Sequence, residues 1–126
     1  MVRTAIPVQV MGAYSAGDDT ITWTAGDAAN DHEFDNKGGR CLLLMKNENV
    51  AAKPATVDSV ACPGSYNRVS DVAMSGAGKG ATVANIGVYG PFPSPFFEQG
   101  EGKVYVDIAD ATDVAFAVVQ IPDVRS

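Results

Sequence analysis

The sequence predicts an all-β fold, either a single-domain antiparallel β-sandwich or a compact β-barrel of the jelly-roll or immunoglobulin-like kind, with about seven or eight short strands. Three observations support this class. Strand signals recur at a spacing of roughly ten residues. No window combines helical periodicity with a cap and a polar face. The 13 Gly and 7 Pro are spread along the chain, as in short strands joined by turns.

The length of 126 residues corresponds to one domain that can bury a core without metal or disulfide staples. We therefore expect residues 1–126 to form one β domain. Its parts are an extended N-terminal arm and loop over residues 1–18, a β core over 19–122 and a tail over 123–126.

The clearest strand signals lie near the C-terminus. Lys103–Ile108 alternates apolar and polar residues, the period of a half-buried strand. Val114–Ile121 is apolar nearly throughout, as in a strand covered on both faces. The residues between them, Asp110, Ala111 and Thr112, predict a tight antiparallel connection. The predicted core residues here are Val104, Val106, Ile108 and most of Val114–Ile121.

Five further strands are expected upstream of these two. Arg40–Lys46 is a continuous apolar run flanked by turn signals, which indicates a central strand. In Asp19–Thr24, Ile21 and Trp23 fall on one face and threonines on the other. The remaining candidates are Ala55–Ala61, Arg68–Met74 and Ala81–Tyr89.

The segment Ala25–Gly39 is expected to be a polar connection, broken only by Phe34. Its oxygen-rich composition raises the question of calcium, but the EF-hand spacing and its final glutamate are absent. A solvated acidic loop without metal is the favoured interpretation. The residues concerned are Asp27, Asp31, His32, Glu33 and Asp35.

A second glycine-rich stretch, Gly76–Thr82, superficially resembles a phosphate-binding loop. That motif needs Ser or Thr directly after its Lys, to hold magnesium, and a helix following it. Gly80 follows Lys79 here and no helix is predicted, so we expect a flexible hairpin tip.

Charge and cysteine content exclude several functions. The formal net charge of −6, without a Lys/Arg cluster, argues against nucleic-acid binding and against an anionic membrane surface. The longest apolar runs are too short to span a bilayer. Cys41 and Cys62 have no zinc-type spacing, and whether they approach each other is left open. Both are expected to be reduced.

No residue pattern indicates catalysis or a cofactor. Nucleophilic or acid–base chemistry needs Ser or Cys beside His, or a perturbed pair of carboxyl groups, in a pocket. The single histidine lies in the acidic segment, Cys41 lies in an apolar strand, and no carboxyl pair stands out. We expect a protein that is not an enzyme and binds no cofactor.

The segment Gly90–Pro95 contains three prolines, which remove backbone donors, so it is not expected to be an interior strand. Two roles are open for its aromatic neighbours. They could form a carbohydrate-binding platform, or pack into the core and the corner of the fold, and packing is favoured. For the corner itself we rank sealing of the core first and contact with another protein second. The aromatic residues are Trp23, Phe92, Phe96 and Phe97.

At the N-terminus, Arg3 precedes the stretch AIPVQVMGA, which has a faint likeness to a signal peptide. Pro7 and Gln9 interrupt the apolar run, so an arm or a first strand is the favoured interpretation. An extended arm such as Val2–Val10 can add a strand to the sheet edge of a partner.

Taken in order, these segments resemble the capsid decoration, or cement, proteins of tailed bacteriophages. The similar features are the arm VRTAIPV, the apolar strand LLLMKN, the strand PATVDSV and the closing stretch from Ile86 to Pro122. That closing stretch reads GPF, F-x-Q, G-x-V-x-V, a last strand and a final proline. The middle, Asn67–Gly80, and the acidic loop have no counterpart in the pattern.

The resemblance implies a structural virion protein, located on the outer capsid surface and assembled in the host cytoplasm. It would bind the outside of an icosahedral head, bridge major capsid protein subunits and stabilise the expanded shell, with a homotrimer as one form of self-association. The alternatives are a carbohydrate- or surface-binding β-sandwich module, and a head–tail joining or tail structural protein. The expected protein-contact residues are Arg3, Ile6, Val8, Phe92, Phe96 and Phe97.

Overall fold

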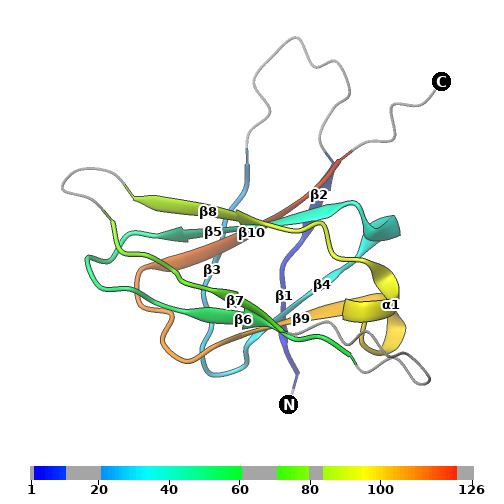
Figure 1. The fold of residues 1–126 in the computed structure, drawn as a ribbon. Coiled ribbons are helices and arrows are strands. Elements are labelled where there is room, and N and C mark those ends of the chain that lie inside the picture. Colours follow the sequence, from blue (N-terminus) through cyan, green and yellow to red (C-terminus); the bar gives the residue numbers. More distant parts are fainter. Residues whose placement is uncertain (1, 11–20, 61–70, 80–83, 122–126) are drawn as a thin grey trace, which may run out of the picture.

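The computed structural model describes residues 2–10, 21–60, 71–79 and 84–121. Two mixed five-stranded sheets pack face to face in a sandwich, shown as the upper and lower layers of Figure 1. The sheets do not close into a barrel, so the sandwich is confirmed and the barrel alternative is wrong. The described residues form ten strands, more than the seven or eight expected.

Sheet I has the strand order β1-β4-β9-β6-β7. These strands are β1 (Thr4–Ala5), β4 (His32–Asp35), β9 (Lys103–Ile108), β6 (Ala55–Val57) and β7 (Val72–Met74). Sheet II has the order β2-β10-β5-β8, and β3 also pairs with β10. Its strands are β2 (Val8–Val10), β10 (Val114–Gln120), β5 (Cys41–Asn47), β8 (Asn85–Tyr89) and β3 (Thr24–Ala25). The short helices are η1 (Lys37–Gly39), α1 (Ser94–Phe97) and η2 (Gly100–Gly102).

The expectation of purely antiparallel sheets is wrong because the N-terminal segment pairs in parallel within both sheets. β1 runs parallel to β4, with Thr4 opposite His32. β2 runs parallel to β10, with Val8 opposite Val118. Between these two strands the chain crosses the sandwich, and Ile6 at the crossing is buried. The segment expected to be an extended arm or a first strand therefore contributes a strand to each layer.

The predicted tight antiparallel connection between β9 and β10 is also wrong. β9 pairs with β4 and β6 in sheet I, whereas β10 pairs with β5, β2 and β3 in sheet II. Both strands are flanked on each edge by other strands, so neither has an edge left for the other. The short connection instead carries the chain from one layer to the other. Asp113 adopts a left-handed conformation in it, with φ 62°.

The prediction for Ala25–Gly39, which was expected to be a polar connection, is wrong as well. His32 and Phe34 are buried and alternate with the less buried Glu33 and Asp35. β4 thereby lies between β1 and β9 as an interior strand of sheet I. The alternation is the period of two of a strand with one face in the core.

The other strand predictions are confirmed in part, some with the predicted bounds and others with shifted or shorter ones. Lys103–Ile108 is β9, and the apolar run after Arg40 is the central strand β5. The predicted strand Asp19–Thr24 begins with two residues, 19–20, that lie outside the described part. Of its described residues only Thr24 is in a strand, which is β3 (Thr24–Ala25). Gly90–Pro95 is indeed not a strand before α1 begins at Ser94. Residues 68–70 and 81–83 of two predicted strands lie outside the described part.

The main core lies between the two sheets. The predicted residues of β9 and β10 are buried there. β10 is also buried on its outer side, where Ala117 and Val119 join Leu44 of β5 in a separate small cluster. None of the helices in the described residues has the length and hydropathy needed to cross a membrane.

Candidate functional site

The outward-facing sides of the two sheets differ sharply in charge. The strands of sheet II contain one charged residue, Lys46. The strands of sheet I contain four, which are Glu33, Asp35, Lys103 and Asp107. Exposed charges hydrate readily, whereas exposed apolar area favours contact with another surface. The outer side of sheet II is therefore the candidate contact site.

The register of sheet II assembles this side from three neighbouring strands. β10 lies beside β5, with Val119 opposite Leu42 and Ala117 opposite Leu44. β8 lies on the other edge of β5, with Val88 opposite Leu44. Opposite residues in an antiparallel pair share one face. We call this set the apolar face: Leu42, Leu44, Ala117, Val119, Ile86 and Val88.

The apolar face is covered unevenly. Over β5 and β10, Ile21 and Trp23 pack against Leu44, Ala117 and Val119. Over β8, Ile86 and Val88 are among the exposed large hydrophobic residues. Val10 of β2 and Ile121, which directly follows β10, are exposed as well. Four of the six exposed large hydrophobic residues in the described part thus lie on sheet II or next to it.

Trp23 is held in place rather than presented as a free ring. The Lys46 Nζ atom lies 4.7 Å from the centroid of the Trp23 ring, a cation–π contact. Trp23 belongs to the outer cluster of sheet II, whereas Phe92 and Phe97 lie in the main core. The four aromatic residues considered for a carbohydrate platform therefore do not share one surface.

On the opposite face, Arg3 fastens the N-terminal segment to sheet I. Its Nη1 donates to the carboxylate of Asp107 at 2.6 Å and to the carbonyl of His32 at 3.2 Å. Its guanidinium carbon lies 4.1 Å from the centroid of the Tyr105 ring. Nη2 lies 4.0 Å from the Asp58 carboxylate. Because all these partners belong to the same chain, Arg3 has an internal structural role.

Beside Arg3, the side chains of Asp58 and Asp107 are hydrogen-bonded to each other. Partial burial raises the pKa of Asp58 to about 7, with further contributions from the hydrogen bond to Asp107 and from the charges of Asp107 and Asp71. Asp58 is thus a perturbed carboxyl group with a second carboxyl group beside it, a pair that no pattern in the sequence had singled out. Its members come from residues far apart in the chain, so only the pairing of β6 with β9 reveals it.

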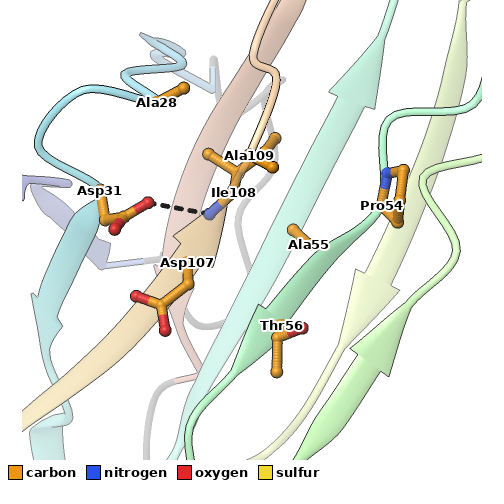
Figure 2. A pocket seen from close by; sticks show the side chains of 8 residues that line it. All are labelled: Ala28, Asp31, Pro54, Ala55, Thr56, Asp107, Ile108 and Ala109. Atoms are coloured by element: carbon orange, nitrogen blue, oxygen red, sulfur yellow. Dashed lines mark hydrogen bonds between the residues drawn. The ribbon is translucent and has the colours of Figure 1, made fainter.

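Figure 2 shows the open hollow next to this pair, a volume of about 560 Å³. Its lining includes Asp31 and Asp107 along with small or apolar residues. The Asp31 carboxylate points to the backbone of Ile108 and accepts its N–H at 2.9 Å. Asp107 is bound to Arg3. Both carboxylates in the hollow are thus used within the fold, and no set of convergent free polar groups marks a ligand site there.

His32, the single histidine, is buried in sheet I and engaged at both ring nitrogens. Nε2 lies 2.8 Å from the backbone nitrogen of Asp27, and Nδ1 lies 3.2 Å from the carbonyl oxygen of Thr4. A backbone N–H can only donate, so Nε2 accepts and the proton is on Nδ1. Burial lowers the pKa of His32, consistent with this neutral form. The residue holds β1 against the start of β4.

The aromatic corner is anchored from within. Phe92 and Phe97 are buried, and Phe92 packs against Phe34 with ring centroids 6.0 Å apart and against Phe97 at 5.3 Å. Asn36 donates from Nδ2 to the carbonyl of Phe92 at 2.9 Å. Phe96 is half-buried. The corner therefore seals one end of the core, as ranked first from the sequence.

The six predicted contact residues consequently fall in two separate places. Arg3, Ile6 and Val8 lie on the N-terminal segment, where Ile6 is buried and Val8 is packed against the core. The three phenylalanines lie at the aromatic corner. None belongs to the apolar face. The signal that pointed to that face was the continuous apolar character of β5 and β10, which the sequence analysis assigned to burial alone.

The remaining candidates from the sequence have no free chemistry. Cys41 is a buried free thiol whose pKa is raised by burial, and Cys62 lies outside the described residues. The start of the glycine-rich stretch is tied down, because Gly76 accepts a backbone hydrogen bond from Lys53 at 2.9 Å. Within the described ranges, no group of three or more His, Cys, Asp or Glu residues is placed to hold a metal ion.

No family model, curated protein or solved structure matches this chain.

Proposed function

We propose that this chain is a structural virion protein, a capsid decoration protein that attaches to the outside of an icosahedral phage head. The observation that carries the proposal is the asymmetry between the two outer faces. The outer face of sheet II is apolar, and Lys46 is the one charged residue in its strands. The outer face of sheet I carries the carboxylates of β4 and β9. A protein that lies on a shell needs one side for the shell and one for water.

In this proposal the apolar face docks against major capsid protein subunits, and sheet I faces outward. The uncovered part of the face lies over β8, where Ile86 and Val88 are exposed. The resemblance of the segment order to capsid decoration proteins supplies the class of partner. Binding to the expanded shell alone would stabilise that state by mass action.

Mixing the purified protein with expanded heads that lack it tests the proposal, with occupancy and shell melting temperature as readouts. A matched pair of variants locates the contact. Leu42→Lys puts a charge on the apolar face, and Ala73→Lys puts the same charge on the exposed side of β7 in sheet I. Urea unfolding of both variants controls for loss of the fold.

We expect Leu42→Lys to lower the affinity by at least about tenfold, because a Lys there must lose its hydration on docking, and Ala73→Lys to bind as the parent does. Absence of binding at micromolar concentration would falsify the proposal. Equal effects of the two variants would contradict the assignment of the face. Labelled protein found at the head–tail junction would support the joining-protein alternative instead.

A further inference from the structure

We propose that the chain forms a two-fold dimer in which β8 pairs antiparallel with β8 of a second copy, so that sheet II continues from one copy into the other. The proposal rests on the edge of the sheet and needs no capsid, so it stands or falls independently of the proposed function.

β8 is the longest strand at an edge of either sheet. It has five residues, and within the described part of the chain it pairs only with β5. The other strands at sheet edges, β1, β2, β3 and β7, have two or three residues each. In an antiparallel pair, alternate residues direct their N–H and C=O groups away from the partner strand. On β8 these groups form a row that can accept another strand.

The devices by which proteins protect such an edge are missing from β8. Natural edges are blunted by charged side chains, proline, bulges or very short strands. β8 reads NIGVY, without a charge or a proline, and each of its residues has a single partner on β5 in an unbroken register. Ile86 and Val88, both on the apolar face, are 51% and 58% exposed. The first proline after β8 is Pro91.

Charge makes β8 the strand at which a second copy would meet the least repulsion. The chain carries a formal net charge of −6, so two copies repel each other, most strongly where carboxylates of sheet I would meet. β8 is uncharged, and its nearest charged neighbour on β5 is Lys46, opposite Ile86. Because β8 contains no carboxylate, pairing of the two β8 strands brings no carboxylates of these strands together.

The sequence of β8 is also complementary to itself. With Gly87 on the two-fold axis, Ile86 faces Val88 of the second copy and Val88 faces Ile86 of the second copy. Both pairs join branched apolar side chains on the exposed side, the kind of cross-strand pair that stabilises sheets. On the inner side, the Tyr89 ring already fills the space beside Gly87, where an added Cβ would lie 2.8 Å from the Tyr89 hydroxyl oxygen. That side needs no further cover.

Sedimentation velocity of the purified full-length chain over a wide concentration range is the primary test. We expect a concentration-dependent monomer–dimer equilibrium. Two double variants test the register. Ile86→Glu with Val88→Glu places like charges opposite each other across the axis, and should weaken dimerisation at least about tenfold. Ile86→Glu with Val88→Lys places opposite charges there, and should dimerise more tightly than the first variant by a similar factor.

Val50→Glu is the matched control, since Val50 is another exposed hydrophobic residue but lies in the loop after β5. It should dimerise as the parent does. Hydrogen exchange of the parent chain provides a readout without variants: amides of residues 85–89 should gain protection as concentration rises. A parent chain that stays monomeric at the highest concentration overturns the proposal. So does a dimer that is insensitive to the paired-glutamate variant, or one weakened equally by both double variants.

Discussion

Replacing Phe92 by alanine should be strongly destabilising without any partner present. The side chain is 1% exposed and contacts the rings of Phe34 and Phe97 in the sealed corner. Truncating a buried phenylalanine typically costs about 3–5 kcal/mol, from lost apolar burial and the cavity left behind. The two ring contacts place Phe92 in the upper part of that range, because such aromatic pairs add about 0.5–1.5 kcal/mol beyond burial.

Urea unfolding followed by the fluorescence of Trp23 measures this loss, since Trp23 is the single tryptophan and is partly buried in the outer cluster. With an m-value of about 1.5 kcal/mol/M, the urea midpoint should fall by about 3 M. If Phe92→Ala is too unstable to fold, Phe92→Leu retains most of the volume and should still lose about 1–2 kcal/mol.

Phe96→Ala is the matched control, because Phe96 is half-buried in the same corner and should lose only about 1 kcal/mol. A loss below about 1.5 kcal/mol for Phe92→Ala would refute the sealing role. Equal losses for Phe92→Ala and Phe96→Ala would refute the distinction between the two side chains.

Three further predictions concern loops and charge. Gly76→Ala should cost more than about 2 kcal/mol in urea unfolding, because Gly76 has φ +56° and an added Cβ would collide with the Lys53 carbonyl, whereas Gly100→Ala, with open space around it, should stay within about 0.5 kcal/mol. Asn47→Ala should lose about 2–3 kcal/mol in the same assay, because the buried amide donates to the carbonyl of Gly76 at 2.9 Å and accepts the N–H of Asn49 at 2.8 Å; a loss under 1 kcal/mol would contradict this role. The pKa of Asp58 is about 7 in the fold, against an ordinary value of 3.8 for an aspartate. The native state therefore holds an extra proton between these values, and the free energy of unfolding should fall as pH rises from about 4 through 7. The fall should be on the order of 1 kcal/mol, since the carboxyl group is partly solvated, and Asp58→Asn should abolish it in unfolding curves at pH 5 and pH 8.

Local patterning predicted the buried face of β9 but not which strands are its neighbours. The alternation in β9 correctly placed Val104, Val106 and Ile108 in the core. The same alternation is compatible with a hairpin from β9 to β10 and with a connection that crosses to the other sheet. A period of two shows which side chains of a strand share a face, but not which strand pairs with it. The crossing requires β4 and β6 to flank β9, and those strands come from distant parts of the sequence.

The failure at β4 has a different cause. A strand of four residues that contains two carboxylates and a histidine has little apolar signal beyond Phe34. β4 is stabilised by contacts of residues in or next to its neighbouring strands. Arg3 donates to Asp107 of β9, and Lys103 of β9 donates to Asp35 of β4. The ring nitrogens of His32 are hydrogen-bonded to backbone atoms of Thr4 and Asp27. Such partners become visible only once β1 is placed beside β4. The pair of carboxyl groups of Asp58 and Asp107 could not be predicted either, because it exists only once β6 is placed beside β9.

The continuous apolar runs of β5 and β10 lead to the main physical argument for a docking partner. A strand that is apolar on both faces is expected in a sheet that is covered on both sides. In the described part of the chain, the inner side of sheet II packs against sheet I in the main core, but the outer side is covered by Ile21 and Trp23 only over β5 and β10. Over β8 the same apolar face remains open. Sheet II thus contains more apolar residues than the described fold buries. A partner on the apolar face would bury the side chains that remain exposed, Ile86 and Val88.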